Sequence, residues 1–151
     1  MRWRAVPVVP RVALVVLFLS SAIVGAWAQV APKSFYDSFP GFGRMWVALD
    51  GPYNQHLVRD IGGLNLGLAF VVAMALVTAS PLLVRAAGGA ALIYGLPHLL
   101  YHATHLSPFD TGDAIAMIVS LSVAVLAAAA ALEARFDGDA VTDGRSAPPP
   151  G

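Results

Sequence analysis

The sequence predicts an all-α fold, a polytopic membrane bundle of four helices with short interfacial helices in the first outer connection. Only 12% of the 151 residues are charged, whereas a soluble domain has about 25%, and 58% are hydrophobic. Four stretches without Asp, Glu, Lys or Arg are each long enough to span a hydrocarbon core of about 30 Å. None has the polar face that a soluble bundle would expose, so the chain is expected to lie in a lipid bilayer.

The composition also excludes several kinds of site. The chain has no cysteine, which excludes disulfides, thiolate metal sites, iron–sulfur clusters and cysteine nucleophiles. Its 9 basic and 9 acidic side chains cancel, so no basic surplus suggests a nucleic acid partner. The length suits one domain rather than two. Any chemistry must therefore use His, Asp, Tyr or Ser.

The first predicted span covers residues 12–30 and follows a short N-terminal segment, residues 1–11. The same region has the layout of a secretory signal peptide, because a basic segment and an apolar stretch precede Ala26-Trp27-Ala28, an A-x-A cleavage pattern. Retention is favoured, since the apolar stretch is long enough to cross the membrane and the bulky Trp27 suits an interfacial anchor. Cleavage stays open as the alternative.

The first outer connection, residues 33–59, is rich in aromatic side chains. It holds six of the chain's 14 Phe, Trp and Tyr residues, interrupted by the turn signals "PGFG" and "DGP". Aromatic residues at this density suit the headgroup layer. We expect two short helices, at residues 34–39 and 44–49, which either anchor the connection at the membrane surface or form a lid over the bundle.

The rest of the chain supplies three more spans and a polar tail. Gly63 and Gly67 form a G-x-x-x-G motif, which predicts a close helix contact. Residues 133–151 are small, acidic and Pro-rich, and this composition predicts a disordered tail. The three spans are predicted at residues 61–80, 86–105 and 114–132, so that the four-helix domain covers residues 12–132.

The basic residues predict the orientation of the spans. Lys and Arg close to span ends are biased toward the cytoplasm. Six of the nine fall on one side if both termini are cytoplasmic, which predicts a multi-pass protein with that orientation. These six are Arg2, Arg4, Arg11, Arg85, Arg135 and Arg145.

Polar residues gather at the predicted outer ends of the spans. His98, His102 and His105 share a helix face, because they are spaced four and three residues apart. His56 and Asp60 are one helical turn apart at the start of the second span. All four histidines of the chain are thus predicted at one level of the membrane. The other members of this predicted polar layer are Tyr94, Tyr101, Asn65, Asp110 and Asp113.

Three hypotheses account for the polar layer. The side chains can bond one another and cap helix ends, which stabilises the bundle. They can bind a metal ion or haem, since imidazoles and carboxylates are suitable ligands, although no Glu accompanies the His pair as in the H-E-x-x-H pattern. They can also line a cavity that handles protons or a ligand. The candidate metal ligands are His56, Asp60, His98, His102 and His105.

The aromatic outer connection and the stretch "LVRDIGGLNLGLA" resemble DoxX-like integral membrane proteins, a broad bacterial group. The resemblance covers most of residues 12–132 and implies a fold and a location, but no catalytic residues. We therefore expect a non-enzymatic membrane protein, either an accessory subunit or a binding protein, with the bilayer and a second copy or another membrane protein as partners. The alternative is a metal- or haem-dependent redox protein that uses His56, His98 and His102.

Overall fold

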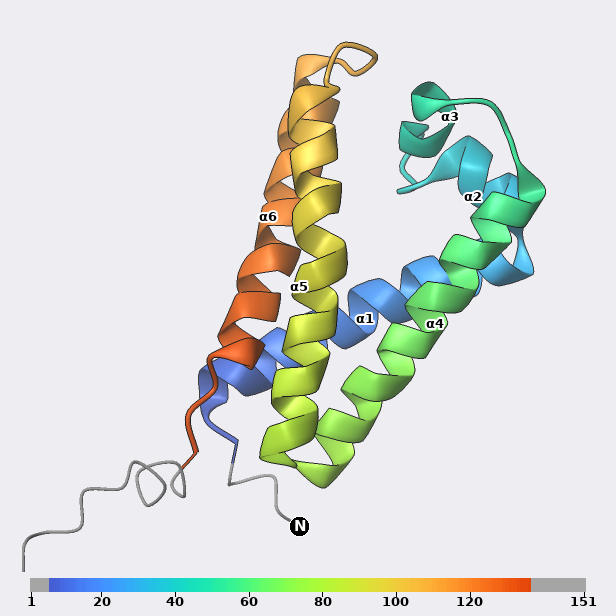
Figure 1. Ribbon diagram of the computed structural model, residues 1–151. Coiled ribbons are helices and arrows are strands. Elements are labelled where there is room, and N and C mark those ends of the chain that lie inside the picture. The colour runs from blue at the N-terminus through green and yellow to red at the C-terminus, as the bar shows by residue number, and fades with distance from the viewer. Residues whose placement is uncertain (1–5, 137–151) are drawn as a thin grey trace, which may run out of the picture.

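The computed structural model describes residues 6–136, and within them the regular secondary structure is all helical, without strands. Four of its helices are long and apolar enough to cross a membrane. This confirms the predicted all-α fold of a small integral membrane protein (Figure 1). The helices are α1 (Val8–Val30), α2 (Pro32–Ser38), α3 (Trp46–Asp50), α4 (Gln55–Thr78), α5 (Pro81–Thr104) and α6 (Thr111–Leu132).

The helix starts follow from local sequence. The side chain of Asn54 accepts a hydrogen bond from the backbone N–H of Leu57 and so caps α4. Asp110 caps α6 in the same way, by accepting from the N–H of Asp113 at 2.8 Å. Pro81 occupies the first turn of α5, where its missing N–H removes no hydrogen bond. The caps make α4 begin at Gln55, six residues before the predicted span.

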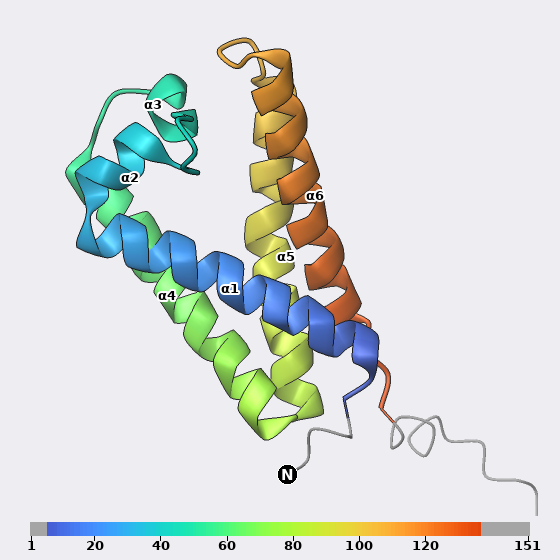
Figure 2. The same cartoon turned by 180° about the vertical axis from the view of Figure 1, so that it is seen from behind.

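The four long helices form two antiparallel pairs, α1 with α4 and α5 with α6 (Figures 1 and 2). The pairs meet near the turn between α4 and α5 and diverge from there. The molecule therefore has a narrow end at this turn and a wide end, where α2 and α3 lie (Figure 2). Helices α2 and α3 confirm the short helices that the sequence predicts in the first outer connection. Of the predicted tail, residues 137–151 lie outside the described residues.

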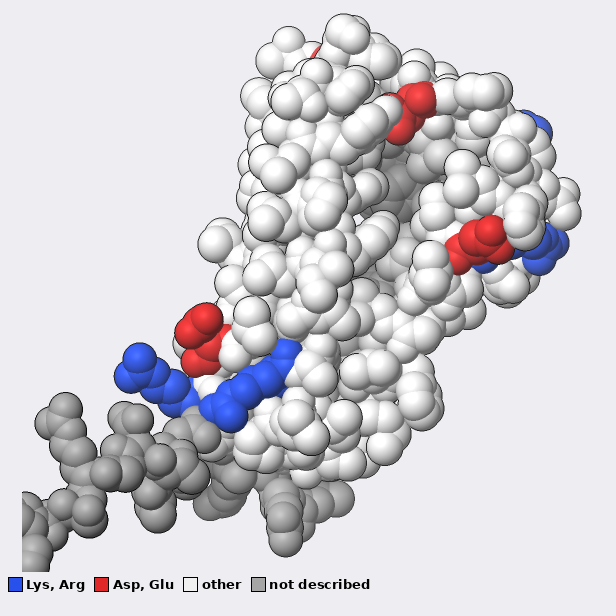
Figure 3. Space-filling model, viewed as in Figure 1, with Lys and Arg blue, Asp and Glu red and all other residues white. Residues whose placement is uncertain are grey.

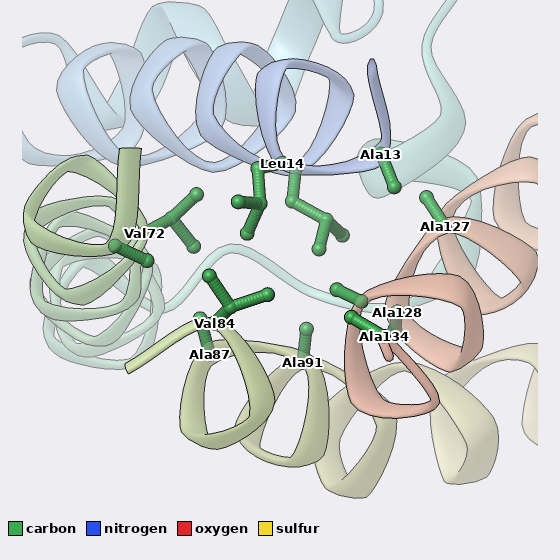
Figure 4. Close-up of a cluster of buried hydrophobic side chains, with 12 residues drawn as sticks. Ala13, Leu14, Val72, Val84, Ala87, Ala91, Ala127, Ala128 and Ala134 are labelled. Carbon is green, nitrogen blue, oxygen red and sulfur yellow. The ribbon is translucent and has the colours of Figure 1, made fainter. Parts of the chain in front are cut away.

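The narrow end holds the larger hydrophobic core, to which all four long helices contribute (Figure 4). Most of its members are alanines, whose small side chains allow the helices to approach closely. Leu14, Val72 and Val84 are the largest fully buried side chains. The cluster comprises Ala13, Leu14, Leu17, Val72, Ala75, Val84, Ala87, Ala91, Ala127, Ala128, Ala131 and Ala134.

Within each pair, glycines let the backbones touch, and Gly25 of α1 and Gly62 of α4 both do so in the first pair. A Cβ atom added at Gly62 of α4 would lie 2.7 Å from the backbone nitrogen of Gln29 in α1. A Cβ at Gly88 of α5 would lie 2.8 Å from the carbonyl oxygen of Ala128 in α6. Real Cβ atoms essentially never approach backbone atoms so closely, so neither site tolerates a side chain without a shift of the helices.

The predicted contact through Gly63 and Gly67 is wrong within this fold. A Cβ added at either glycine meets no atom within 4 Å. Successive residues of an α-helix point about 100° apart, so the face of α4 that carries Gly62 packs on α1, whereas the neighbouring Gly63 faces away. The motif correctly predicted that α4 makes a close helix contact, but the glycine of α4 at this contact is Gly62.

The two kinds of glycine give a matched stability test. Gly62→Leu is expected to destabilise the protein by about 3 kcal/mol or more, because overpacking forces α1 and α4 apart. Gly67→Leu adds the same side chain in open space and is expected to change stability by less than about 0.5 kcal/mol. Thermal unfolding in detergent, followed by circular dichroism, measures both. Equal losses in the two variants would contradict the α1–α4 contact.

Candidate functional site

A cavity of about 370 Å³ lies between the two helix pairs toward the wide end, and residues from all six helices line it. Figure 3 shows the molecule hollowed between α5 and the segment that carries α2 and α3. Pockets for small molecules have volumes of about 300–1,000 Å³, so the cavity is large enough for a small ligand. It exists because the helix pairs meet at one end and diverge toward the other.

The walls of the cavity are mainly apolar. Three polar side chains in them already have partners, because Ser20, Asn65 and Ser120 each donate a hydrogen bond to a carbonyl of their own helix, three or four residues earlier. Such local bonds leave little polar capacity for a ligand. The apolar lining includes Leu17, Leu68, Ala91, Leu121 and Ala124.

The polar part of the lining comes from α5 and α3. His98 and His102 are one turn apart on α5, with ring centroids 4.7 Å apart and planes at 82°. Tyr94 stacks on His98, with centroids 5.5 Å apart. Trp46 and Asp50 are likewise four residues apart on α3, and both line the cavity. Two helical turns thus present an imidazole pair and an indole–carboxylate pair to the same space.

Two atoms of this polar part are buried without a hydrogen-bond partner among the described residues. They are Nε1 of Trp46 and Nδ1 of His102. Buried polar groups in proteins nearly always have a partner, because leaving one unpaired costs about 1–3 kcal/mol. Both atoms are also shielded from the cavity, because neither has appreciable accessible surface, so they are not placed to bond a ligand there.

Among the described residues, Asp50 is the only charged one that lines the cavity. It is close enough to interact electrostatically with both His98 and His102. The hydroxyl group of Tyr101 lies 3.5 Å from its Oδ1 atom, which brings α3 next to α5. The sequence analysis did not identify Asp50, which lies one residue beyond the short helix predicted at residues 44–49, although its i, i+4 spacing from Trp46 was a usable signal.

An ion pair holds the segment before α3 against α6. Arg44 donates from Nη1 to Oδ1 of Asp113, whose side chain is only 12% exposed. Asp113 belongs to the first turn of α6, where a carboxylate is favoured by the helix dipole, as expected from the sequence. The two paired residues are 69 positions apart in the sequence, so the ion pair helps to hold the wide end closed over the cavity.

The structure divides the predicted polar layer into separate groups. Tyr94, Asn65, His98 and His102 line the cavity. His105 instead stacks on Tyr101, with ring centroids 4.2 Å apart. Asp110 is the cap of α6.

His56 and Asp60 pair with each other on an exposed face of α4, at 3.2 Å. Their side chains are 88% and 54% exposed. Because α4 and α5 diverge from their turn, the described partner of His56 is Asp60 and not a histidine of α5 (Figure 1). Within residues 6–136, no group of three or more His, Asp or Glu side chains is placed to hold a metal ion. The metal or haem hypothesis stays a prediction.

Comparison with known proteins identifies no relative of this chain. No protein-family model, curated protein or solved structure matches the chain. The resemblance to DoxX-like proteins stays a prediction. The cavity is therefore the feature of the molecule that bears on its function.

The ion pair at the wide end can be tested against an exposed one. Asp113→Asn is expected to lower the free energy of unfolding by about 1–2 kcal/mol, because it removes a charge-assisted bond between a half-buried arginine and a nearly buried carboxylate. Asp60→Asn alters the exposed pair with His56 and is expected to cost less than about 0.5 kcal/mol. Thermal unfolding in detergent compares them, and a larger loss in Asp60→Asn would contradict the role of Asp113.

Proposed function

We propose that this small integral membrane protein is a binding protein, which holds a small and largely apolar molecule in the cavity between its helix pairs. The observation that carries the proposal is the cavity itself, with mainly apolar walls and the side chains of Asp50, His98 and His102 in its lining. Ligand sites are typically apolar with a few convergent polar groups that fix orientation. The cavity has this composition.

Two features favour binding over a purely structural role for the polar residues. A purely structural layer would leave no space for a ligand, yet Asp50, His98 and His102 line a cavity of about 370 Å³. Apolar lining contributes about 25 cal/mol per Å² of surface that a ligand removes from water, so an apolar molecule gains from entering. Holding such a molecule suits an accessory subunit or a carrier, acting with a second copy or another membrane protein.

We propose a bacterial inner membrane as the location, with both termini in the cytoplasm and the wide end on the outer side. The support is the bias of basic residues, six of which then lie on the cytoplasmic side. We also propose that α1 is retained. Ala28, the last residue of the A-x-A pattern, is fully buried at the contact with Gly62, so packing explains a small residue at this position without cleavage.

An N-terminal epitope tag tests retention and orientation together. If α1 is retained, the purified protein has the mass of the full tagged chain, and the tag is digested by protease in inverted membrane vesicles but not in intact spheroplasts. Loss of the tag from the purified protein would contradict retention. Digestion in spheroplasts with an intact mass would contradict the orientation alone.

The binding function can be tested with an uncharged dodecyl chain that carries a photoreactive diazirine. With the protein in nanodiscs, we expect crosslinks at cavity residues such as Leu17, Leu68 and Leu121, located by mass spectrometry. Ala124→Trp fills the cavity and should reduce these crosslinks by about tenfold, as loss of about 1.4 kcal/mol of binding energy would. Ala86→Trp places the same side chain on an exposed face of α5 and should leave them unchanged. Equal labelling in both variants would overturn the proposal.

The redox alternative would use His98 and His102, which lie side by side, together with His56 on the exposed face of α4. An i, i+4 histidine pair can bind a metal ion. Elemental analysis and an absorption spectrum of the same purified protein address it directly. Stoichiometric metal or a haem band would favour this function over binding.

A further inference from the structure

We infer that the cavity binds an organic cation with an apolar body, such as a quaternary ammonium group on an alkyl chain, in preference to a neutral or an anionic analogue. The inference rests on the proposed binding function and specifies the charge of the ligand that the cavity holds. It follows from the carboxylate in the lining, from its place along the cavity and from the partners of the nearby basic residues.

Asp50 gives the cavity a negative charge that no basic residue offsets. Among the described residues it is the only charged one in the lining, and it takes part in none of the ion pairs between them. The hydroxyl group of Tyr101, which lies 3.5 Å from its Oδ1 atom, is a neutral partner. A carboxylate beside an apolar cavity attracts a cation more strongly than one in bulk water, because the effective dielectric constant is lower.

The basic residues of the wide end bond to groups outside the lining. These contacts are those of Lys33 with Asp37, of Arg44 with Asp113, and of Arg59 with the backbone oxygen of Gln29. None of the three basic residues lines the cavity. A carboxylate or phosphate on a ligand would therefore meet the like charge of Asp50 without a counter-ion in the described lining, which disfavours an anionic ligand.

The charge and the apolar walls lie at different depths of the cavity. Asp50 lines the cavity and is also exposed, so its carboxylate lies where the cavity opens. Leu17 and Ala91 line the same cavity, yet they belong to the buried core of the narrow end. The cavity thus runs from a charged opening to an apolar floor. A ligand with a cationic head at one end and an apolar body at the other matches both.

The lining favours an organic cation over a metal ion. His98 and His102 share the lining with Asp50, but within residues 6–136 no three His, Asp or Glu side chains are placed to hold a metal ion together. A metal ion needs several such ligands at bonding distance to replace its water. A quaternary ammonium group forms no directed bonds, so one carboxylate attracts it through charge alone while its alkyl groups contact the apolar walls.

Competition against the photoreactive dodecyl probe tests the charge preference without any variant. The protein is placed in nanodiscs of phosphatidylcholine at pH 8, where imidazoles are ordinarily neutral. The competitors are dodecyltrimethylammonium, 1-dodecanol and dodecanesulfonate, with each concentration corrected for partition into protein-free nanodiscs. We expect the ammonium compound to displace the probe from Leu17, Leu68 and Leu121 at the lowest concentration and the sulfonate at the highest. The reverse order of these two would overturn the inference.

Two substitutions connect the preference to Asp50. In Asp50→Asn, the advantage of dodecyltrimethylammonium over dodecanol should fall about fivefold, which corresponds to about 1 kcal/mol, the upper range for an exposed ion pair. Asp50→Lys reverses the charge, so dodecanesulfonate should then displace the probe at the lowest concentration. Asp60→Asn is the matched control, because it removes an exposed carboxylate that lies outside the lining, and it should leave the preference unchanged.

The outcomes separate this inference from the binding function. If Asp50→Asn keeps the full preference while Ala124→Trp still reduces labelling, the charge inference fails and the binding function stands. If Ala124→Trp leaves labelling unchanged, both fail. An equal loss of preference in Asp60→Asn would also overturn the inference, because the effect would then come from the surface of the wide end. Thermal unfolding in detergent verifies that each variant is folded.

Discussion

The constraint on which the rest of the structure depends is the close backbone approach within each helix pair. Gly62 lets α4 touch α1, and Gly88 lets α5 touch α6. The two tight pairs then join through small side chains at the narrow end, where alanines fill most of the core. Since lipid offers no hydrophobic driving force between helices, such close packing is what holds them together. The pairs diverge beyond this core, and the cavity forms between them.

The connection between α1 and α4 covers the wide end because its own side chains fix its position. Phe35 and Phe39 of the α2 segment pack on Trp27 of α1, with ring centroids about 6 Å apart. The hydroxyl group of Tyr36 donates to the backbone oxygen of Gly51 at 2.6 Å, which holds the end of α3. The Arg44–Asp113 pair fastens the same segment to α6. These contacts bring Trp46 and Asp50 to the cavity.

The polar residues of the protein fall into two kinds, and the difference supports a binding role. Those in the apolar wall, such as Asn65 and Ser120, are satisfied by their own helices. Those of α3 and α5, such as Asp50, His98 and His102, line the cavity without being bonded to the backbone of their own helices. They give the otherwise apolar cavity a few polar groups, as ligand sites typically have.

The sequence by itself determined the class of the protein, because the length and hydropathy of each segment decide whether it can cross a membrane. It also determined where α4, α5 and α6 begin, because these starts depend on the local residues Asn54, Pro81 and Asp110. It could not determine which face of α4 packs on α1. The motif therefore predicted a close contact at Gly63 and Gly67, whereas the contact is made at Gly62. Only the tertiary structure placed His98 and Asp50 together in the lining of the cavity and His56 with Asp60 on an exposed face of α4. Both results depend on the angle between the helix pairs, which is set by packing far along the chain rather than by any local pattern.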